Sequence, residues 1–471
     1  MNVVCHIEQM NYDSIYFIGI GGIGMSNLAR YFLSKGKRVG GYDRTESALT
    51  RLLQEEGAFI HYADDVHSIP ALFFDNEKTL VVYTPAVPAS HAELLFFRKH
   101  GYRVIKRAQL LGEITAASDA VCVAGTHGKT TVSSMIAHLL RQSKVDCNAF
   151  LGGILKNYRT NLLLSDKSNI TVVEADEYDR SFHWLKPWIA VITSADPDHL
   201  DIYGTEAAYR ESFEKFTSLV RPDGYLVIRK GIPITPHSSE TVKIWNYGES
   251  EGDFHAENIR IGNGEVLFDL VTPSEVIKDI SPGIPVKINI ENSVAAAAAA
   301  LLCGAAPEEI REGIHTFQGA SRRFDFHIKT DRIVFIDDYA HHPGELSAAI
   351  QSIRAIYPDK KVTAIFQPHL YSRTRDFASA FAESLSLLDD VILLDIYPAR
   401  EEPIEGVSSH IIFDKITSAE KVLCTKQELP GLLRQKEVEV LVTFGAGDID
   451  RLLPAIEELL RNKYLSEDKS L

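Results

Sequence analysis

Short runs of apolar residues alternate along the chain with stretches of helical periodicity. Most of these runs are rich in β-branched residues and carry apolar side chains at consecutive positions, which is typical of strands buried on both faces of a parallel sheet. Eight such runs lie at residues 15–18, 121–124, 170–173, 189–193, 333–336, 362–366, 391–394 and 438–444. Strands that alternate with helices in this way predict the α/β fold class.

Three segments each begin with a buried strand that is followed by a loop rich in chemically active residues. They open at Ile15, near Val121 and near Ile333. In the second segment, Asn263-Gly264 is flanked by alternating apolar residues, which predicts a hairpin and a small antiparallel sheet. Six consecutive alanines at 295–300 predict a helix packed closely against a sheet. We expect three domains, at residues 1–117, 118–320 and 321–471.

The composition narrows the class of protein. At about 100–200 residues per domain, a chain of 471 residues suggests two to four domains. Asp and Glu number 64 against 49 Lys and Arg, and the net charge of −15 argues against a general nucleic-acid binder. Phosphorylated small molecules stay possible, because a few backbone amides and one lysine can dominate the local field.

The cysteines and the chain's apolar stretches indicate a compartment. Five scattered cysteines without a CxxC pair fit a reducing environment. Residues 1–10 show no apolar core of a secretory signal, and the uncharged stretch at 292–307, which no other in the chain exceeds, is too short to cross a bilayer. We therefore expect a cytoplasmic protein with no membrane partner.

A first glycine loop follows the strand at 15–18 and precedes a helical stretch at 25–33. Gly19, Gly21 and Gly24 fit the pattern G-x-G-x-x-G, and Asp43 follows 19 positions after the last glycine. Such glycines let a nucleotide diphosphate approach amides at a helix N-terminus. Taken alone this loop favours NAD, and a simple packing turn between helix and strand is the alternative.

A second loop, at 124–131, also lies between a strand and a helix. Lys129 can reach the β- and γ-phosphates of a nucleotide, and Thr130 can ligate Mg²⁺. The loop departs from the ordinary P-loop, because Gly125 precedes Gly128 by three positions rather than five. Two phosphate loops in two domains exclude a simple dehydrogenase and indicate an NTP-driven reaction on a second nucleotide-like ligand.

Acidic residues and histidines follow several other strands. Glu174 stands at the end of the strand at 170–173, where a carboxylate can hold Mg²⁺ beside the phosphate loop. His199 lies in a carboxylate-rich loop at 196–201 and is a candidate metal ligand. Further polar loops at the carboxyl ends of strands, where α/β sheets bind ligands, lie at 337–343, 367–376 and 444–448. Each of the first two is a surface loop in the alternative interpretation.

These residues, in this order, resemble the Mur ligase family, whose members use ATP to form amide bonds in peptidoglycan synthesis. The resemblance covers essentially the whole chain and is strongest to the member that joins L-alanine to UDP-N-acetylmuramate. It implies an N-terminal Rossmann-like domain, a central P-loop-type ATPase domain with a parallel sheet plus a small antiparallel sheet, and a C-terminal Rossmann-like domain. The similar blocks lie at 19–25, 125–131, 174–182, 198–203, 337–343, 366–376 and 397–403.

The resemblance also implies ligands and site residues. The N-terminal domain would hold the UDP substrate, the central domain ATP, and the C-terminal domain L-alanine, in a monomer or homodimer. The substrate-binding residues carried over are Gly21, Gly22, Ile23, Gly24, Thr84, Arg107, Tyr339 and His369. The ATP-binding residues are Gly125, Thr126, His127, Gly128, Lys129, Thr130, Thr131, Asn292, Arg323 and Asp338. The Mg²⁺ ligands are Thr130, Glu174 and His199, and the catalytic set is Lys129, Glu174, His199, His341 and Arg373.

The implied reaction phosphorylates the muramate carboxylate to an acyl phosphate, which the alanine amine attacks. His341 or a nearby carboxylate would take the amine proton, and the sequence leaves both open. The chain departs from the family pattern at Glu291, Leu370 and Arg400. Three rival readings are a ligase of the same scaffold that adds a peptide or glutamate, a non-catalytic nucleotide sensor, and a NAD dehydrogenase. The last would leave the loop at 124–131 unexplained.

Overall fold

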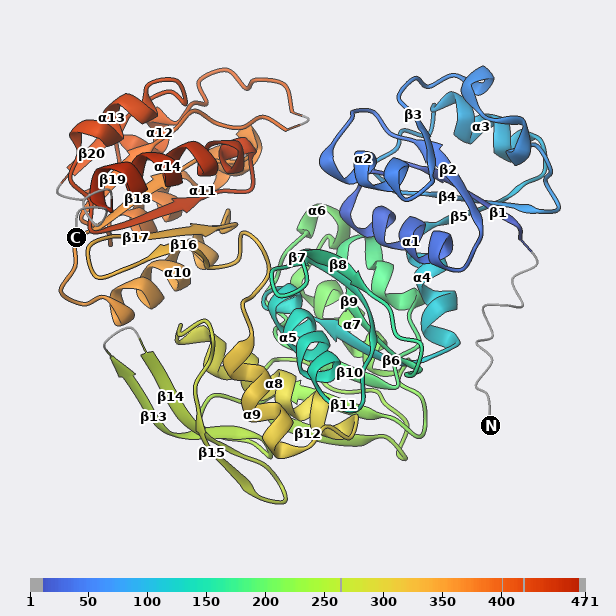
Figure 1. Cartoon of the computed structure of the whole chain (residues 1–471), viewed down its shortest axis with the longest axis horizontal. Helices are drawn as coiled ribbons and strands as arrows, with labels where there is room; N and C mark the ends of the chain where they lie inside the picture. The colour runs from blue at the N-terminus through green and yellow to red at the C-terminus, as the bar shows by residue number, and fades with distance from the viewer. Residues whose placement is uncertain (1–11, 263–264, 400, 418–419, 466–471) are drawn as a thin grey trace, which may run out of the picture. The chain divides into compact units, whose positions relative to one another are not determined.

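A computed structural model describes residues 12–262, 265–399, 401–417 and 420–465 (Figure 1). The chain divides into two compact units. The first comprises residues up to Asn258 together with Phe268–Ile280 and Glu291–Gln318, and the second comprises Ile259–Leu267, Ser281–Ile290 and the chain from Gly319 onward. In the described part of the chain, no helix is both long and apolar enough to span a membrane.

The first sheet has five parallel strands in the order β3-β2-β1-β4-β5. Its strands are β1 (Ser14–Ile18), β2 (Arg38–Tyr42), β3 (Phe59–His61), β4 (Thr79–Tyr83) and β5 (Arg103–Lys106). Its helices are α1 (Ile23–Ser34), α2 (Ala48–Glu55), α3 (Ala92–Lys99) and α4 (Arg107–Ala116). Successive residues of β1 enter opposite cores: Phe17 packs with α1 and α4, and Tyr16 packs with Phe97 of α3. This two-sided burial explains the continuous apolar run.

The chain order reverses at β1, whose neighbours β2 and β4 lie on either side of it. In open α/β sheets ligands bind at such a switch point, outside the carboxyl ends of the strands. The first glycine loop starts at that end of β1, so the topology places it where a ligand is expected.

The second sheet has seven strands in the order β12-β11-β10-β6-β9-β7-β8, and only β8 pairs antiparallel. Its strands are β6 (Asp119–Ala124), β7 (Asn148–Leu155), β8 (Thr160–Leu163), β9 (Ile170–Ala175), β10 (Ile189–Ile192), β11 (Tyr225–Arg229) and β12 (Lys243–Tyr247). The helices along this part of the chain are α5 (Lys129–Gln142), α6 (Leu200–Tyr203), α7 (Glu206–Thr217), α8 (Ile288–Leu302) and α9 (Pro307–Thr316). The six alanines of α8 are completely buried, as the sequence predicted.

A three-stranded sheet follows, formed by β13 (His255–Gly262), β14 (Glu265–Val271) and β15 (Val276–Ile280). β14 and β15 pair antiparallel, which confirms the expected small antiparallel sheet. The predicted turn at Asn263-Gly264 lies outside the described residues.

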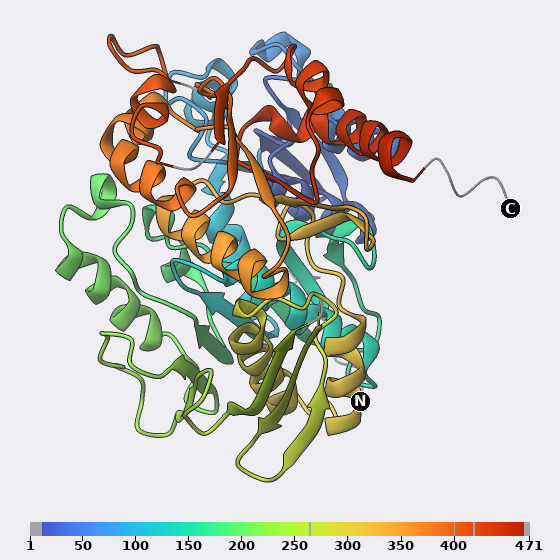
Figure 2. The same cartoon turned by 90° about the vertical axis from the view of Figure 1, so that its left-hand side faces the viewer.

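The second unit contains a six-stranded sheet in the order β16-β17-β21-β18-β19-β20, with only β16 antiparallel. Its strands are β16 (Asp325–Lys329), β17 (Val334–Asp338), β18 (Val362–Phe366), β19 (Asp390–Leu393), β20 (Glu420–Leu423) and β21 (Val440–Phe444). Its helices are α10 (Pro343–Ile356), α11 (Tyr371–Leu385), α12 (His410–Phe413), α13 (Leu429–Gln435) and α14 (Leu453–Tyr464). α13 and α14 share one apolar core with the sheet, while Phe381 of α11 contacts Phe366 of β18. Figure 2 shows α14, in red, as the last helix of this unit.

All eight predicted strands are confirmed, with ends shifted by at most two residues. The α/β class, the parallel sheets and the small antiparallel sheet are therefore those expected from the sequence.

Candidate active site

The second glycine loop is shaped by a close approach to the end of β10. Gly125 has φ +148° and Gly128 has φ +82°, which L side chains rarely adopt. A Cβ on Gly125 would lie 2.0 Å from Thr193 Oγ1, so only glycine fits there. A hydrogen bond also holds the loop, because the His127 N–H donates to Ser194 Oγ at 2.8 Å. The result is a rigid set of backbone amides at the N-terminus of α5, which suits a phosphate.

The Lys129 ammonium folds back over this loop. Its Nζ donates to the Gly125 carbonyl at 2.5 Å, to the Thr126 carbonyl at 3.3 Å and to Glu177 Oε1 at 2.9 Å. Glu177 is only 2% exposed, and burial raises the pKa of its carboxyl while Lys129 opposes that shift. For Lys129 burial lowers the pKa, but the charges of Glu177 and Glu174 more than compensate and raise it above its usual value. The lysine is thus held as a cation beside the phosphate loop.

A hydroxyl and a carboxylate meet at the start of α5. The Thr130 hydroxyl donates to Glu174 Oε2 at 2.9 Å, and Glu174 is carried by β9, next to β6 in the sheet. Gly152 of β7 lies against the same carboxylate, because a Cβ there would come within 2.2 Å of Glu174 Oε2. Oxygen donors of these two kinds are those that Mg²⁺ prefers, so the pair fits the expected metal.

His199 lies at the N-terminus of α6, in the left-handed region with φ +53°. Its Nε2 is 4.0 Å from Glu177 Oε1 and 3.8 Å from Asp198 Oδ2, and its ring meets Tyr178 edge-on at 5.2 Å. Over the described ranges of the chain, no three His, Cys, Asp or Glu side chains are placed to hold a metal by themselves. A cation here would therefore complete its coordination with oxygens of a bound ligand.

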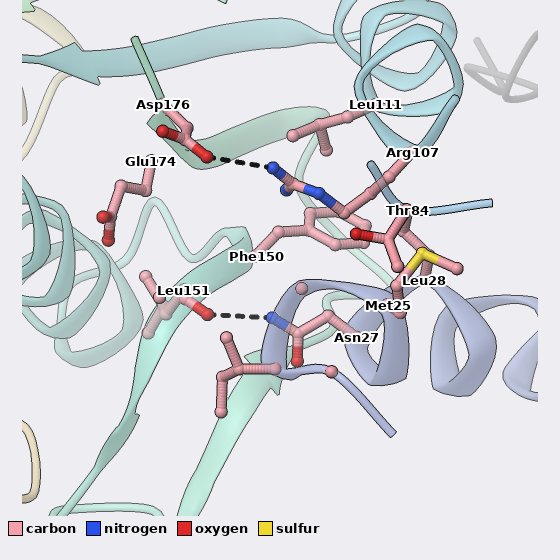
Figure 3. A pocket seen from close by; sticks show the side chains of 14 residues that line it. Met25, Asn27, Leu28, Thr84, Arg107, Leu111, Phe150, Leu151, Glu174 and Asp176 are labelled. Carbon is pink, nitrogen blue, oxygen red and sulfur yellow. Dashed lines mark hydrogen bonds and ion pairs between the residues drawn. The ribbon is translucent and has the colours of Figure 1, made fainter. Parts of the chain in front are cut away.

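A pocket of about 310 Å³ connects the first glycine loop to the Glu174 carboxylate (Figure 3). Arg107 points into it and pairs with Asp176 at 3.2 Å. The lining includes residues that the sequence predicted to bind substrate and the predicted metal ligand Glu174. The former are Gly22, Ile23, Gly24, Thr84 and Arg107. It also includes apolar side chains that the sequence did not single out, namely Met25, Leu28, Leu111 and Phe150. Such a mixed lining suits a ligand with a charged and an apolar portion.

The remaining residue of the first glycine loop that was predicted to bind substrate, Gly21, is not part of this lining. Its N–H donates to Asp43 Oδ2 at 2.7 Å, so Asp43 braces the loop itself. In dinucleotide-binding proteins the acidic residue at this place binds a ribose hydroxyl. The engagement of Asp43 by the loop argues against the NAD reading.

Asn292, expected at the adenine, lies beside the phosphate loop: a Cβ on Gly128 would come within 3.3 Å of Asn292 Oδ1. Its neighbour Glu291, which departs from the family pattern, accepts a hydrogen bond from Arg229 Nε at 2.8 Å. The Glu291 side chain is thus engaged in an ion pair with Arg229.

In the second unit, the predicted residues gather at the carboxyl end of β17. Asp338 accepts the N–H groups of Phe324 at 2.7 Å and Ala340 at 2.8 Å. Burial raises the pKa of Asp338 to about 6, against the opposing charge of Arg323. The Arg323 guanidinium stands 5.1 Å over the Tyr339 ring. These contacts fix the loop that presents Tyr339.

His341 follows in the same loop. Its Nδ1 lies 3.0 Å from the Tyr339 carbonyl and 3.3 Å from Glu345 Oε2, which assigns the proton to Nδ1 and leaves Nε2 as the basic nitrogen. Burial lowers the pKa of His341, and the charge of Arg373 acts in the same direction. The His369 ring lies 6.0 Å from that of His341. The unit therefore brings four predicted residues, Tyr339, His341, His369 and Arg373, to one place.

Leu370 and Arg400 were noted as departures in the sequence. Leu370 has φ +69° at the start of α11, a strained conformation for a branched side chain, and its N–H bonds the Tyr397 carbonyl at 2.9 Å. Arg400 lies outside the described residues.

Sequence reasoning missed three contributors to the first unit's site. Glu177 pairs with Lys129, Asp176 pairs with Arg107, and Gly152 makes room for Glu174. The first two stand in the acidic stretch at 172–177, but nothing in the order of residues tells which carboxylate meets which cation. Gly152 carries no local signal, because its reason lies on the neighbouring strand.

Three family models match the chain in succession. A model described as "Mur ligase family, catalytic domain" covers residues 14–119, "Mur ligase middle domain" covers 123–300, and "Mur ligase, glutamate ligase domain" covers 322–447.

Curated proteins and solved structures agree with these models. A UDP-N-acetylmuramate–L-alanine ligase of Parabacteroides distasonis is 64% identical over 95% of this chain and 97% of its own length. The protein of the same name from Porphyromonas gingivalis W83 is 55% identical over 95% and 99%. The crystal structure of UDP-N-acetylmuramate-alanine ligase from Thermotoga maritima is 27% identical, covers 96% of this chain and 99% of its own, and superposes with a TM-score of 0.80.

Proposed function

The chain belongs to the Mur ligase family, and from this premise we propose that it joins L-alanine to the carboxylate of UDP-N-acetylmuramate in peptidoglycan precursor synthesis. The observation that carries the proposal is the match over the full length to ligases of that name. The site agrees, because one unit presents a phosphate loop with a lysine and, beside it, a pocket that runs from Glu174 to the first glycine loop. ATP is the energy source of the reaction.

We assign residues 1–117 to the UDP substrate, 118–320 to ATP and 321–471 to the amino acid. The diphosphate would bind at Gly22–Gly24 with Arg107, and the muramate carboxylate would reach toward Glu174 through the pocket. We place the protein in the cytoplasm, where UDP-linked precursors and ATP are available, as a monomer or homodimer.

Carboxylates do not acylate amines at neutral pH, so the reaction needs an activated acyl group. A carboxylate oxygen attacks the γ-phosphorus of ATP, ADP leaves, and an acyl phosphate forms. The amine of L-alanine then attacks the acyl carbon, and the phosphate departs with the former carboxylate oxygen. Lys129 and the amides of the loop at 125–131 would bind and neutralise the phosphates during the first step.

We assign one Mg²⁺ to Thr130 and Glu174, whose hydroxyl and carboxylate fit such an ion together with phosphate oxygens, and a second Mg²⁺ to His199. Bound there, the ions would supply charge neutralisation for the transferred phosphoryl group. The chain's own part is to orient the phosphates and to exclude water from the acyl phosphate.

The amine must be neutral when it attacks. We assign proton removal to His341, because its Nδ1 is directed to the Tyr339 carbonyl and its lowered pKa keeps Nε2 unprotonated at neutral pH. Arg373, on the same unit, would face the alanine carboxylate.

An ADP-release assay scanned over acceptors tests the proposal. Purified protein with UDP-N-acetylmuramate, ATP and Mg²⁺ should release ADP when L-alanine is added. Release that depends instead on a tripeptide or on glutamate would assign the chain to another ligase of the same scaffold, and no release with any acceptor would favour a nucleotide sensor.

A further inference from the structure

The Glu177 carboxylate lies between two groups that the reaction needs. One oxygen, Oε1, accepts from Lys129 Nζ at 2.9 Å and lies 4.0 Å from His199 Nε2. The other, Oε2, is also 2.9 Å from the ammonium but is buried and has no hydrogen bond of good geometry to any residue that the structure describes. A buried carboxylate oxygen with unused acceptor capacity, facing a nucleotide loop, is a place where a cation is expected.

The backbone holds Glu177 and His199 in a fixed relation. The Tyr203 hydroxyl donates to the Glu177 carbonyl at 2.5 Å, and the Tyr203 N–H donates to the His199 carbonyl at 3.0 Å. Tyr203 itself is 5% exposed and packs edge-on against Tyr209 at 4.8 Å. One buried tyrosine therefore ties the backbones of both residues to α6 and keeps Glu177 close to His199.

Lys129 cannot serve Glu177 and the nucleotide in the same way. Its Nζ bonds the loop carbonyls of Gly125 and Thr126, so it occupies the space over the loop where phosphates would bind. If the ammonium turns to the phosphates, the carboxylate loses its strongest partner while it stays buried. An uncompensated buried charge is strongly destabilising, and a second cation can take the place of the lysine.

We propose that Glu177 exchanges Lys129 for Mg²⁺ when nucleotide binds, and that Glu177 thereby becomes a metal ligand beside His199. The proposal rests on the ATP and Mg²⁺ part of the proposed function. A carboxylate and an imidazole fit an ion that takes few protein ligands and completes its shell with phosphate oxygens and water. The exchange makes Lys129 available to phosphate only when the metal arrives with it.

Equilibrium binding of a non-hydrolysable ATP analogue, AMP-PNP, tests the exchange without turnover. Its Kd is measured for the full chain and for Glu177→Gln in excess Mg²⁺ and in EDTA. In the wild type Mg²⁺ should tighten binding. In Glu177→Gln binding should weaken in Mg²⁺ and tighten in EDTA, because the variant lacks a metal ligand and also lacks the carboxylate that competes for Lys129. The Mg²⁺ effect, Kd in EDTA divided by Kd in Mg²⁺, should fall by at least about tenfold.

Asp179→Asn is the matched control. It removes a carboxylate two residues away, whose partner is Lys106 at 2.7 Å, and Asn tolerates the φ of +52° at this position. Its Mg²⁺ effect should equal that of the wild type.

Equal changes of Kd in Mg²⁺ and in EDTA for Glu177→Gln would overturn the proposal and leave Glu177 as a counter-ion only. If that variant does not fold, as judged by its thermal transition, Glu177→Asp decides, because it keeps the charge but withdraws the carboxylate by one methylene. A reduced Mg²⁺ effect supports a ligand, and an unchanged one overturns it. If Mg²⁺ does not change the Kd of the wild type for AMP-PNP, the metal role of the whole site is refuted. L-alanine-dependent ADP release would still test the ligase function separately.

Discussion

Gly152→Ala adds one methyl group at a position that has no reactive atom of its own. The new Cβ would lie 2.2 Å from Glu174 Oε2, 2.8 Å from Cδ and 3.0 Å from Oε1. Ordinary contacts begin at 3.4 Å, so Oε2 must retreat by about 1.2 Å from its place beside Thr130. The variant therefore displaces the carboxylate proposed to hold Mg²⁺ without removing it.

A displacement of about 1 Å in a catalytic constellation can lower the rate by about 10²-fold. We expect kcat for L-alanine-dependent ADP release to fall by about that factor and the Mg²⁺ concentration for half-maximal rate to rise. Gly431→Ala is the control, because its Cβ meets no heavy atom within 4 Å and it lies inside α13. A Mg²⁺ titration of all three proteins gives both quantities. Wild-type kinetics in Gly152→Ala, with normal folding, would refute the placement of Glu174 at the metal.

Three further changes test other parts of the account. Lys129→Ala should lower the rate of ADP release by at least about 10²-fold, because charge stabilisation at the phosphates is lost. The Kd for UDP-N-acetylmuramate, measured by calorimetry, should change little. Substantial turnover in this variant would exclude the assigned role of Lys129. Gly24→Ala places a Cβ 2.9 Å from Arg107 Nη1. The KM for UDP-N-acetylmuramate should therefore rise several-fold, with kcat nearly constant. An unchanged KM would show that Arg107 is not part of the substrate site. Burial lowers the pKa of His138 to about 4. The contribution of its neutral form to the free energy of unfolding is therefore complete above pH 6.5 and is lost as the pH falls through 4, by about 3 kcal/mol in total. His138→Gln should flatten the loss of unfolding free energy between pH 7 and pH 4 in urea titrations, and an equal loss in both proteins would contradict this.

The sequence predicts the strands well because their burial is encoded locally. A strand such as β1 sends Phe17 and Tyr16 into two cores, and this shows directly as a continuous apolar run. Strand order is different, since the pairing of β6 with β9 and β10 joins residues some fifty to seventy positions apart and leaves no local pattern. The loops could be recognised, whereas their neighbours in space could not.

The same distinction holds within the site. Lys129, Thr130 and Glu174 are recognisable because phosphate and metal chemistry demands those residue types after a strand. Glu177 differs from its acidic neighbours only in being buried against Lys129, which the fold decides. Asp43 shows the reverse case, because its spacing suggests a ribose contact but its carboxylate bonds the Gly21 amide. Contacts of this kind follow from tertiary structure and not from spacing.

The most direct test of the central claim follows the oxygen atoms of the reaction. UDP-N-acetylmuramate labelled with ¹⁸O in its carboxylate is incubated with ATP, Mg²⁺ and L-alanine, and products are analysed by mass spectrometry. The account predicts one alanyl product for each ADP, and inorganic phosphate that carries one ¹⁸O from the carboxylate. Unlabelled phosphate would contradict the acyl phosphate, and the absence of an alanyl product would contradict the ligase function itself.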